Sequence, residues 1–203
     1  MKLRYSAASP YVRKVRVVAI EKGLAGKIEN VPTSVSPNKD SSEVAGENPL
    51  MKVPSLMTDD GMSLYDSPVI CEYLDAEGSG PALFPPPGKA RWTALRRQAL
   101  GDGILDAALL SRYETFLWPK EYLWKDWLEG QQRKVKAGLD ALEQEADSFG
   151  KAVDIGLITI GCALGYLDFR FAADEWRKGH PKLAAWYEGF SARPSMRETV
   201  PQG

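Results

Sequence analysis

The chain has 203 residues, of which 44% are hydrophobic and 26% are charged. This composition is typical of a globular protein, and the length allows one large domain or two small ones. The 26 basic and 27 acidic side chains leave a net charge of −1. No overall field therefore attracts the chain to nucleic acid or to an anionic membrane surface, and we expect neither as a partner.

The apolar segments of the sequence predict neither a secretion signal nor a membrane span. The first residues enter an alternating strand pattern directly, with no charged-then-apolar leader, which predicts that there is no secretion signal. The longest uncharged stretch of the second half, residues 155–167, is too short for a membrane span and predicts a buried core helix. We therefore expect a cytoplasmic protein.

The residues that could bind a metal are few and scattered. Cys71 and Cys162 both lie in apolar helical patterns, which favours two small buried side chains over a disulfide or a reactive pair. The single histidine, His180, lies far from both in the sequence. This spacing does not match a zinc site, and we expect no metal.

The first part of the chain alternates short strands with short helices. Residues 2–5 alternate polar and apolar side chains, as a strand does, and a helix follows with Pro10 in its first turn and Gly23 at its end. A second strand is expected near residues 27–31. Residues 53–66 read as a hairpin that turns at Gly61, and residues 67–77 read as a helix with Ser67 as N-cap. The order β-α-β, hairpin, α is that of a thioredoxin-like domain.

The second part contains long helices only. Residues 79–89 hold four prolines and two glycines, which interrupt regular structure and predict a linker. Helices are expected over residues 90–117, 120–149, from 154 onward, and over 181–192. The predicted organisation is therefore an α/β thioredoxin-like domain over residues 1–78, a linker over 79–89 and an all-α domain over 90–203.

Several motifs carry a family resemblance. They are SPYVRKVR at the first helix, NPLMKVPSL before the hairpin, YDSPVICEYLD at the next helix, and GCALGYLDFR and HPKLAAWYEGFSARPS in the helical part. With these motifs in this order around a proline-rich linker, the chain resembles a cytosolic glutathione S-transferase over nearly its whole length. The resemblance is to bacterial members with a serine in the active site, and it implies a homodimer that uses glutathione to attack a small apolar electrophile.

Ser9 is the expected catalytic residue. Glutaredoxin-type redox proteins carry C-P-Y-C at such a turn, whereas this chain has Ser9 and Val12 at the two cysteine positions. A free thiol has a pKa near 8.5, and lowering it by about two units requires about 2.7 kcal/mol of preference for the thiolate. A hydroxyl at a helix N-terminus could supply a hydrogen bond of about 1.5–3 kcal/mol. Two alternatives remain open: Ser9 could be a plain N-cap, and Ser6 could take its role.

The resemblance implies where the rest of glutathione binds. The backbone of Val53, before a cis Pro54, would pair with the cysteinyl part like an added strand, although a trans proline at the start of a strand is the plain alternative. Asp66 and Ser67 would bind the ammonium and carboxylate of the γ-glutamyl end, at a helix start that they could also cap. Charged side chains near the sulfur or the glycine carboxylate would be Arg13 and Lys52, with Lys39 as a competitor for Lys52; each could equally be a solvated surface charge.

The electrophile pocket is less well defined by the sequence. Aromatic side chains beside Ser9 and near the end of the long helix are the candidates for an apolar pocket, and each could instead fill the core. They are Tyr11, Tyr113 and Trp118, together with Phe116 and Trp124.

One position departs from the family pattern. Members often carry an S/T-x-x-D box at the start of the buried helix, whereas this chain has Asp154 first and Leu157 in place of the acid. Asp154 can still accept a hydrogen bond from an N–H two or three residues later, so we expect a structural cap.

Two other functions stay open on the same scaffold. One is a glutathione-dependent isomerase or disulfide reductase, although a hydroxyl cannot form a mixed disulfide with glutathione. The other is a non-catalytic binding or partner protein, because a fold does not determine a function.

Overall fold

The computed structural model describes residues 1–203 and divides into two compact units. The first unit comprises Met1–Pro86 together with Pro194–Gly203, and the second comprises Pro87–Arg193. The division falls between Pro86 and Pro87, inside the proline-rich stretch. The last ten residues group with the first unit, whereas the sequence interpretation assigned them to the helical domain.

The first unit contains a four-stranded mixed sheet. Its strands are β1 (Lys2–Tyr5), β2 (Glu29–Pro32), β3 (Ser55–Met57) and β4 (Ser63–Leu64), in the spatial order β2-β1-β3-β4. β1 is parallel to β2, while β1–β3 and β3–β4 are antiparallel pairs. The predicted hairpin is therefore present, and Gly61 at its turn has a φ of +87°, which glycine adopts without strain. This is the strand order of a thioredoxin-like sheet, as expected.

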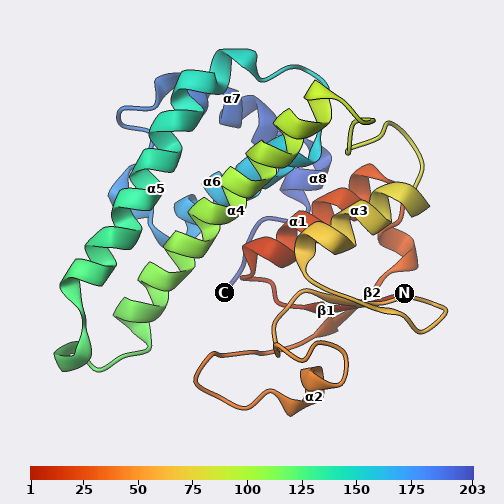
Figure 1. Ribbon diagram of the computed structural model, residues 1–203, viewed down its shortest axis with the longest axis horizontal. Coiled ribbons are helices and arrows are strands. Elements are labelled where there is room, and N and C mark those ends of the chain that lie inside the picture. The colour runs from red at the N-terminus through yellow and green to blue at the C-terminus, as the bar shows by residue number, and fades with distance from the viewer. The chain divides into compact units, whose positions relative to one another are not determined.

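Helices complete the first unit. They are α1 (Pro10–Glu21), α2 (Ser42–Ala45), α3 (Ser67–Glu77) and α8 (Pro194–Arg197), with a 3-10 turn at Ala25–Lys27. α1 packs against α3 and α8, which lie beside it in Figure 1. Val12, Val15 and Ala19 of α1 are buried, as their helical spacing predicts. The core of this unit lies between these helices and the sheet.

The start of α3 corrects one prediction. Asp66 is the N-cap, with extended backbone angles, and Ser67 is already the first helical residue. Pro68 follows in the first turn, where a missing N–H costs no intrahelical hydrogen bond. Proline is therefore tolerated at the second helical position, one residue beyond the first position that it prefers.

The second unit is entirely helical. It contains α4 (Lys89–Phe116), α5 (Lys125–Glu145), α6 (Ile155–Arg170) and α7 (Pro181–Ser191), joined in part by 3-10 turns at Lys120–Tyr122, Ala146–Ser148 and Ala172–Asp174. α6 is buried along most of its length and packs against α4. The expected helix over 120–149 is shorter at both ends. A separate 3-10 turn at Lys120–Tyr122 precedes α5, and α5 passes directly into the 3-10 turn at Ala146–Ser148. No helix of the chain combines the length and the apolar character needed to cross a membrane.

Candidate functional site in the thioredoxin-like unit

Strand register gathers three of the predicted segments at one end of the sheet. Arg4 near the end of β1 pairs with Ser55 at the start of β3, and Leu56 pairs with Leu64 at the end of β4. The residues that follow β1, precede β3 and follow β4 therefore leave the sheet at the same end. These are the segments that carry Ser9, Val53-Pro54 and Asp66-Ser67. Sequence positions up to about sixty residues apart thus share one edge of the first unit.

Ser9 caps α1 with its side chain. Its backbone is extended, and its Oγ accepts a hydrogen bond of 3.3 Å from the N–H of Val12. The N–H of Ser9 donates to the Ser6 carbonyl at 3.1 Å, which closes the turn between β1 and α1. The N-cap alternative is therefore correct as a structural description. This contact uses one lone pair of the hydroxyl oxygen and leaves its proton unused. Ser9 can therefore cap α1 and still donate a hydrogen bond.

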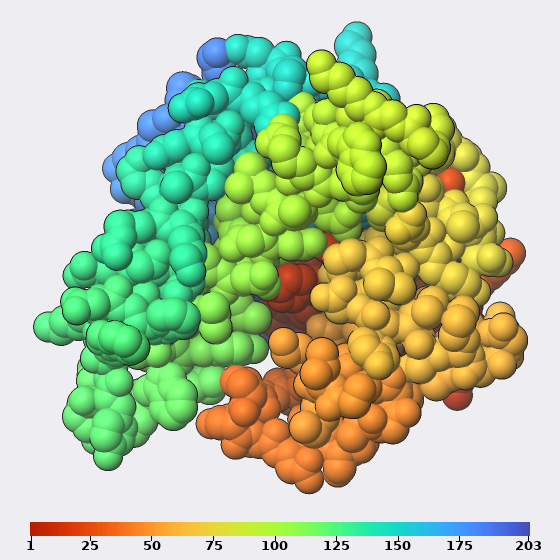
Figure 2. Space-filling view, in the orientation of Figure 1, coloured from red at the N-terminus to blue at the C-terminus, as the bar shows by residue number.

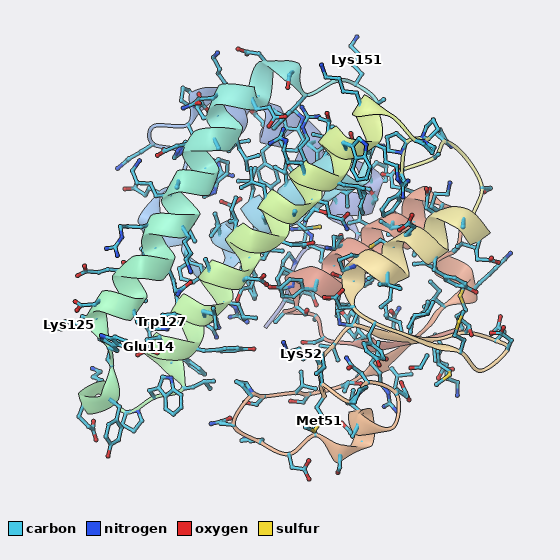
Figure 3. All side chains as sticks on the ribbon, in the orientation of Figure 1. Met51, Lys52, Glu114, Lys125, Trp127 and Lys151 are labelled. Carbon is cyan, nitrogen blue, oxygen red and sulfur yellow. The ribbon has the colours of Figure 1, made fainter.

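The segment before β3 is shaped by a buried asparagine. The side-chain amide of Asn48 donates to the Lys52 carbonyl at 3.0 Å, and its oxygen accepts from the N–H of Leu50 at the same distance. The sequence-based prediction of the site did not include this residue, although an Asn-Pro pair is a recognised turn signal. Lys52 itself is exposed, and Figure 3 labels it beside Met51 in this segment.

The peptide bond between Val53 and Pro54 is cis, as predicted. Neither the N–H nor the carbonyl of Val53 takes part in a backbone hydrogen bond. Strand β3 begins only at Ser55, so Val53 lies outside the paired part of the sheet and its N–H and carbonyl are both unpaired. Such an edge can accept a further extended peptide.

Asp66 and Ser67 differ sharply in exposure. Asp66 is exposed, and its carboxylate makes no capping hydrogen bond to α3, so it is available to a ligand. Ser67 is 1% exposed and stands at the first helical position, where backbone N–H groups have no intrahelical acceptor. Groups that can donate to a carboxylate therefore lie next to a group that can accept from an ammonium at this helix start.

Arg13 is buried, so it is not the solvated surface charge that the sequence leaves open as an alternative. Its Nη2 donates to the Met196 carbonyl at 3.0 Å, and its Nε donates to Thr199 Oγ1 at 3.4 Å. Both partners belong to the C-terminal segment of the first unit. The sequence gives no signal for this contact, because 183 and 186 positions separate the partners.

The aromatic candidates are distributed over both units. Tyr11 is half-buried in α1, while Tyr113 is half-buried near the end of α4. Burial raises the pKa of Tyr113, with Arg112 opposing the shift, so its hydroxyl stays protonated at neutral pH and can donate. Trp118 is 54% exposed.

The connection between α4 and α5 is rich in exposed aromatic residues. It forms the projecting green end of the second unit in Figure 2. At this end Glu114 of α4 accepts a hydrogen bond of 2.8 Å from the N–H of Trp124, the N-cap of α5. Figure 3 labels Glu114 near Lys125 and Trp127 of α5. The exposed side chains are Phe116, Trp118, Tyr122 and Trp124.

The second unit has a cavity of about 250 Å³ between α4, α5 and the end of α6. His180 lines it and is fixed there, since its Nδ1 lies 2.5 Å from the Trp176 carbonyl and its Nε2 lies 2.9 Å from Asp140. None of the predicted site residues lines this cavity, so we do not assign the predicted electrophile pocket to it. Its other walls are formed by Ala108, Ser111, Gln132, Val135, Lys136, Leu139, Leu167, Phe171, Asp174, Trp176 and Lys178.

Both cysteines are buried, and neither forms a disulfide. This agrees with the prediction of two small core side chains. No three His, Cys, Asp or Glu side chains come together in a way that could hold a metal ion.

Two family models match the chain. Residues 8–77 match the N-terminal domain of glutathione S-transferase, and residues 125–189 match its C-terminal domain. The two matches together cover about two thirds of the sequence, one in each half. The chain belongs to the glutathione S-transferase family.

Individual relatives agree with this assignment. The GST-like protein YibF of Escherichia coli, an uncharacterised protein, is 36% identical over 99% of this chain and 98% of its own length. A glutathione transferase family member from Pseudomonas fluorescens Pf-5, solved with bound glutathione, is 45% identical with a TM-score of 0.97, covering 100% of this chain and 99% of its own. A glutathione S-transferase from Methylobacillus flagellatus with glutathione bound is 37% identical with a TM-score of 0.91, covering 99% of each chain.

Proposed function

We propose that this protein is a glutathione transferase in which Ser9 stabilises the thiolate of bound glutathione for attack on an apolar electrophile. The observation that carries the proposal is the state of the Ser9 hydroxyl at the N-cap of α1. Its oxygen accepts from the N–H of Val12, and its proton remains to be donated. Glutathione is proposed as the source of the thiol because similar proteins were solved with glutathione bound.

The physical basis is a preference for the charged sulfur. A thiolate near the start of α1 would accept the Ser9 hydrogen bond and would also face the positive end of the helix dipole. Together these terms favour the thiolate over the thiol and so lower the pKa of the sulfur. Ser9 itself forms no covalent bond in this scheme. The glutathione sulfur is the nucleophile, and the leaving group departs from the electrophile.

The remaining groups would hold the tripeptide along the sheet edge. The unpaired N–H and carbonyl of Val53, before Pro54, suit the cysteinyl part. Asp66 suits the γ-glutamyl ammonium, and the N–H groups at the start of α3, with Ser67, suit its carboxylate. The exposed Lys52 suits the glycine carboxylate. Every charged group of glutathione then has a partner of opposite charge or a backbone donor.

The second substrate is expected to be small and apolar. Tyr11, Tyr113 and Trp118 stay the candidates for its pocket, and a protonated Tyr113 could donate a hydrogen bond to a polar group on the electrophile. The family resemblance further suggests a cytoplasmic homodimer. A detoxifying role follows from the same reaction class, because conjugation with glutathione makes an apolar electrophile polar.

The test measures the ionisation of bound glutathione. Thiolate absorbance of the complex is followed against pH for the wild type, Ser9→Ala and Ser6→Ala, and binding is followed by calorimetry. Ser9→Ala is expected to raise the pKa of the bound thiol and to slow conjugation of an aryl halide about 10- to 100-fold, because it removes one hydrogen bond to a charged group. Ser6→Ala is expected to retain both properties.

The controls separate the rival functions. Asp154→Ala removes an N-cap of the same kind in the second unit, so it reports what loss of a cap alone does to activity. Turnover of a disulfide substrate with no turnover of an aryl halide would replace conjugation by reduction. Absence of saturable glutathione binding would leave a non-catalytic partner protein. A thiol pKa that is the same in the wild type and Ser9→Ala would rule out the role of Ser9.

A further inference from the structure

The C-terminal segment Pro194–Gly203 contacts α1 at several points along its length. At the end of α1, Ser195 Oγ donates to the carboxylate of Glu21 at 2.5 Å. Near the start of α1, Arg13 donates to Met196 and Thr199, as described above. Beyond the segment's helix, the N–H of Gln202 donates to the Ala7 carbonyl at 3.3 Å.

The segment therefore follows α1 from its last residue to the turn that precedes it. Figure 1 shows this path, with the blue C-terminal end of the chain close to the red start of α1. Ser195, Met196 and Thr199 are all at most 2% exposed, so the contact is packed as well as hydrogen-bonded. Thr199 also donates to the Ser195 carbonyl at 2.7 Å, which links α8 to the residues that follow it.

Two of these contacts lie on either side of Ser9. Ala7 comes two residues before it, and Arg13 comes one helical turn after it. The N–H of Arg13 donates to the Ser9 carbonyl at 3.0 Å, so the residue that holds the segment is itself bonded to Ser9. The direction in which the Ser9 hydroxyl points depends on this turn. A hydrogen bond weakens steeply once its angle falls far from linear, so small displacements of the turn affect it.

Arg13 has no other role visible in its own contacts. Its Nη1 is buried without a hydrogen-bond partner, so the segment supplies the acceptors that compensate for burial of the guanidinium. Without the segment, a charged group would stay buried with fewer partners, and α1 would have to shift to release it.

We propose that the segment Pro194–Gly203 is a brace that holds Ser9 in position, and that Arg13 is the positioning residue through which it acts. This inference rests on the proposed function of Ser9. It replaces the sequence-based role of Arg13, in which its positive charge alone would favour the thiolate. The brace acts by geometry, so the charge of Arg13 is not sufficient.

The experiment uses two variants that leave Ser9 unchanged. One ends the chain at Val200, which removes Gln202 and its bond to Ala7 while Arg13, Met196 and Thr199 remain. The other is Arg13→Lys, which keeps the positive charge but cannot donate from the two nitrogen positions of the guanidinium. Arg197→Gln is the matched control, because it removes a positive charge from an exposed position of the same segment.

The readouts are the pKa of the bound glutathione thiol, kcat and KM for conjugation, and the Kd of glutathione. In both variants we expect the thiol pKa to rise toward its free value and kcat at neutral pH to fall about 3- to 10-fold, because the hydrogen bond from Ser9 is weakened rather than removed. The Kd measured at a pH where the sulfur of glutathione stays protonated is expected to change less than about 2-fold, because the segment provides no ligand contact in this scheme. Arg197→Gln is expected to match the wild type.

Amide hydrogen exchange at Val12 and Arg13 gives a second readout that needs no glutathione. Both variants are expected to exchange faster at these positions, because the first turn of α1 is less constrained. Faster exchange with an unchanged thiol pKa and kcat would overturn the inference and leave the segment a purely structural contact. Wild-type behaviour in Arg13→Lys and the shortened chain, with an effect of Ser9→Ala, would also overturn it while the proposed function stands. If Ser9→Ala itself leaves the thiol pKa unchanged, the proposed function fails first, and the inference fails with it.

Discussion

Lys22 and Asp75 form an ion pair of 3.0 Å whose side chains are 3% and 9% exposed. Lys22 lies just after α1, and Asp75 lies in the last turns of α3. The same carboxylate accepts the N–H groups of Leu83 and Phe84 at 2.9 and 3.0 Å. One acidic side chain thus joins two helices of the first unit to the beginning of the proline-rich stretch.

Removal of Asp75 is expected to be strongly destabilising. Asp75→Ala leaves two backbone N–H groups without their acceptor and the buried ammonium of Lys22 without its counter-charge, so that only the Gly80 and Pro81 carbonyls accept from it. Breaking a buried pair in this way costs about 3–5 kcal/mol. Urea denaturation followed by circular dichroism measures the loss. Glu129→Ala serves as the control, because its pair with Arg133 is 3.8 Å long and exposed, and such pairs contribute about 0–1 kcal/mol. Equal stabilities of the two variants would contradict the prediction.

Gly156 is expected to tolerate no side chain. A Cβ at this position would lie 2.6 Å from the Ala94 carbonyl oxygen and 2.6 Å from Arg97 Cβ, both on α4. Gly156→Ala should therefore force α4 and α6 apart and cost about 1–3 kcal/mol of stability. Gly103→Ala, on the exposed side of α4 with nothing within 4 Å, should instead be neutral or stabilising by up to about 1 kcal/mol. Thermal melts of the two variants provide the measurement. A melting temperature for Gly103→Ala below that of Gly156→Ala would contradict the prediction.

Asp154 is expected to contribute stability but no activity. Its Oδ1 accepts the N–H of Leu157 at 2.9 Å and so caps the buried helix α6, as predicted from the sequence. Asp154→Ala should cost about 1–2 kcal/mol, while Asp154→Ser, which restores an acceptor, should recover most of the loss. The two melting curves are compared with the wild type. Overlap of the Asp154→Ala curve with the wild type would reject the cap as a stabilising contact.

Glu145 is expected to make stability depend on pH. Partial burial opposes its charged form, but hydrogen bonds from Arg96 at 2.6 Å and Arg97 at 2.8 Å outweigh this and hold its pKa below the ordinary 4.5. Because the folded pKa is the lower one, the unfolded chain binds the proton first. The stabilisation is complete above pH 4.5 and is lost as the pH falls through the folded pKa.

The measurement compares the wild type with Glu145→Gln. The variant should be less stable at pH 7, and the difference in free energy of unfolding should shrink as the pH is lowered below 4.5. Denaturant titrations at several pH values give this difference directly. A gap that stays constant from pH 7 to the acid limit would show that ionisation of Glu145 does not contribute.

Local patterns in the sequence predict the elements and most of the residues of the candidate site. The alternation at residues 2–5, the proline in the first turn of α1 and the turn at Gly61 are local signals, and the helices and strands follow them closely. Ser9, Val53-Pro54 and Asp66-Ser67 were found because motifs and chemistry identify them without knowledge of distance. The cap at Asp154 is also local, since donor and acceptor are three residues apart.

The contacts between distant residues are visible only once the chain is folded. The sequence leaves open whether Arg13 lies near the sulfur or is a solvated surface charge, and the structure buries its guanidinium against Met196 and Thr199. The last ten residues belong to the first unit rather than to the helical one. Neither outcome has a local signature. The partners of a side chain that lie more than 180 positions away in the sequence depend on how whole elements pack. Packing is a property of the assembled core, so no short stretch of sequence predicts it.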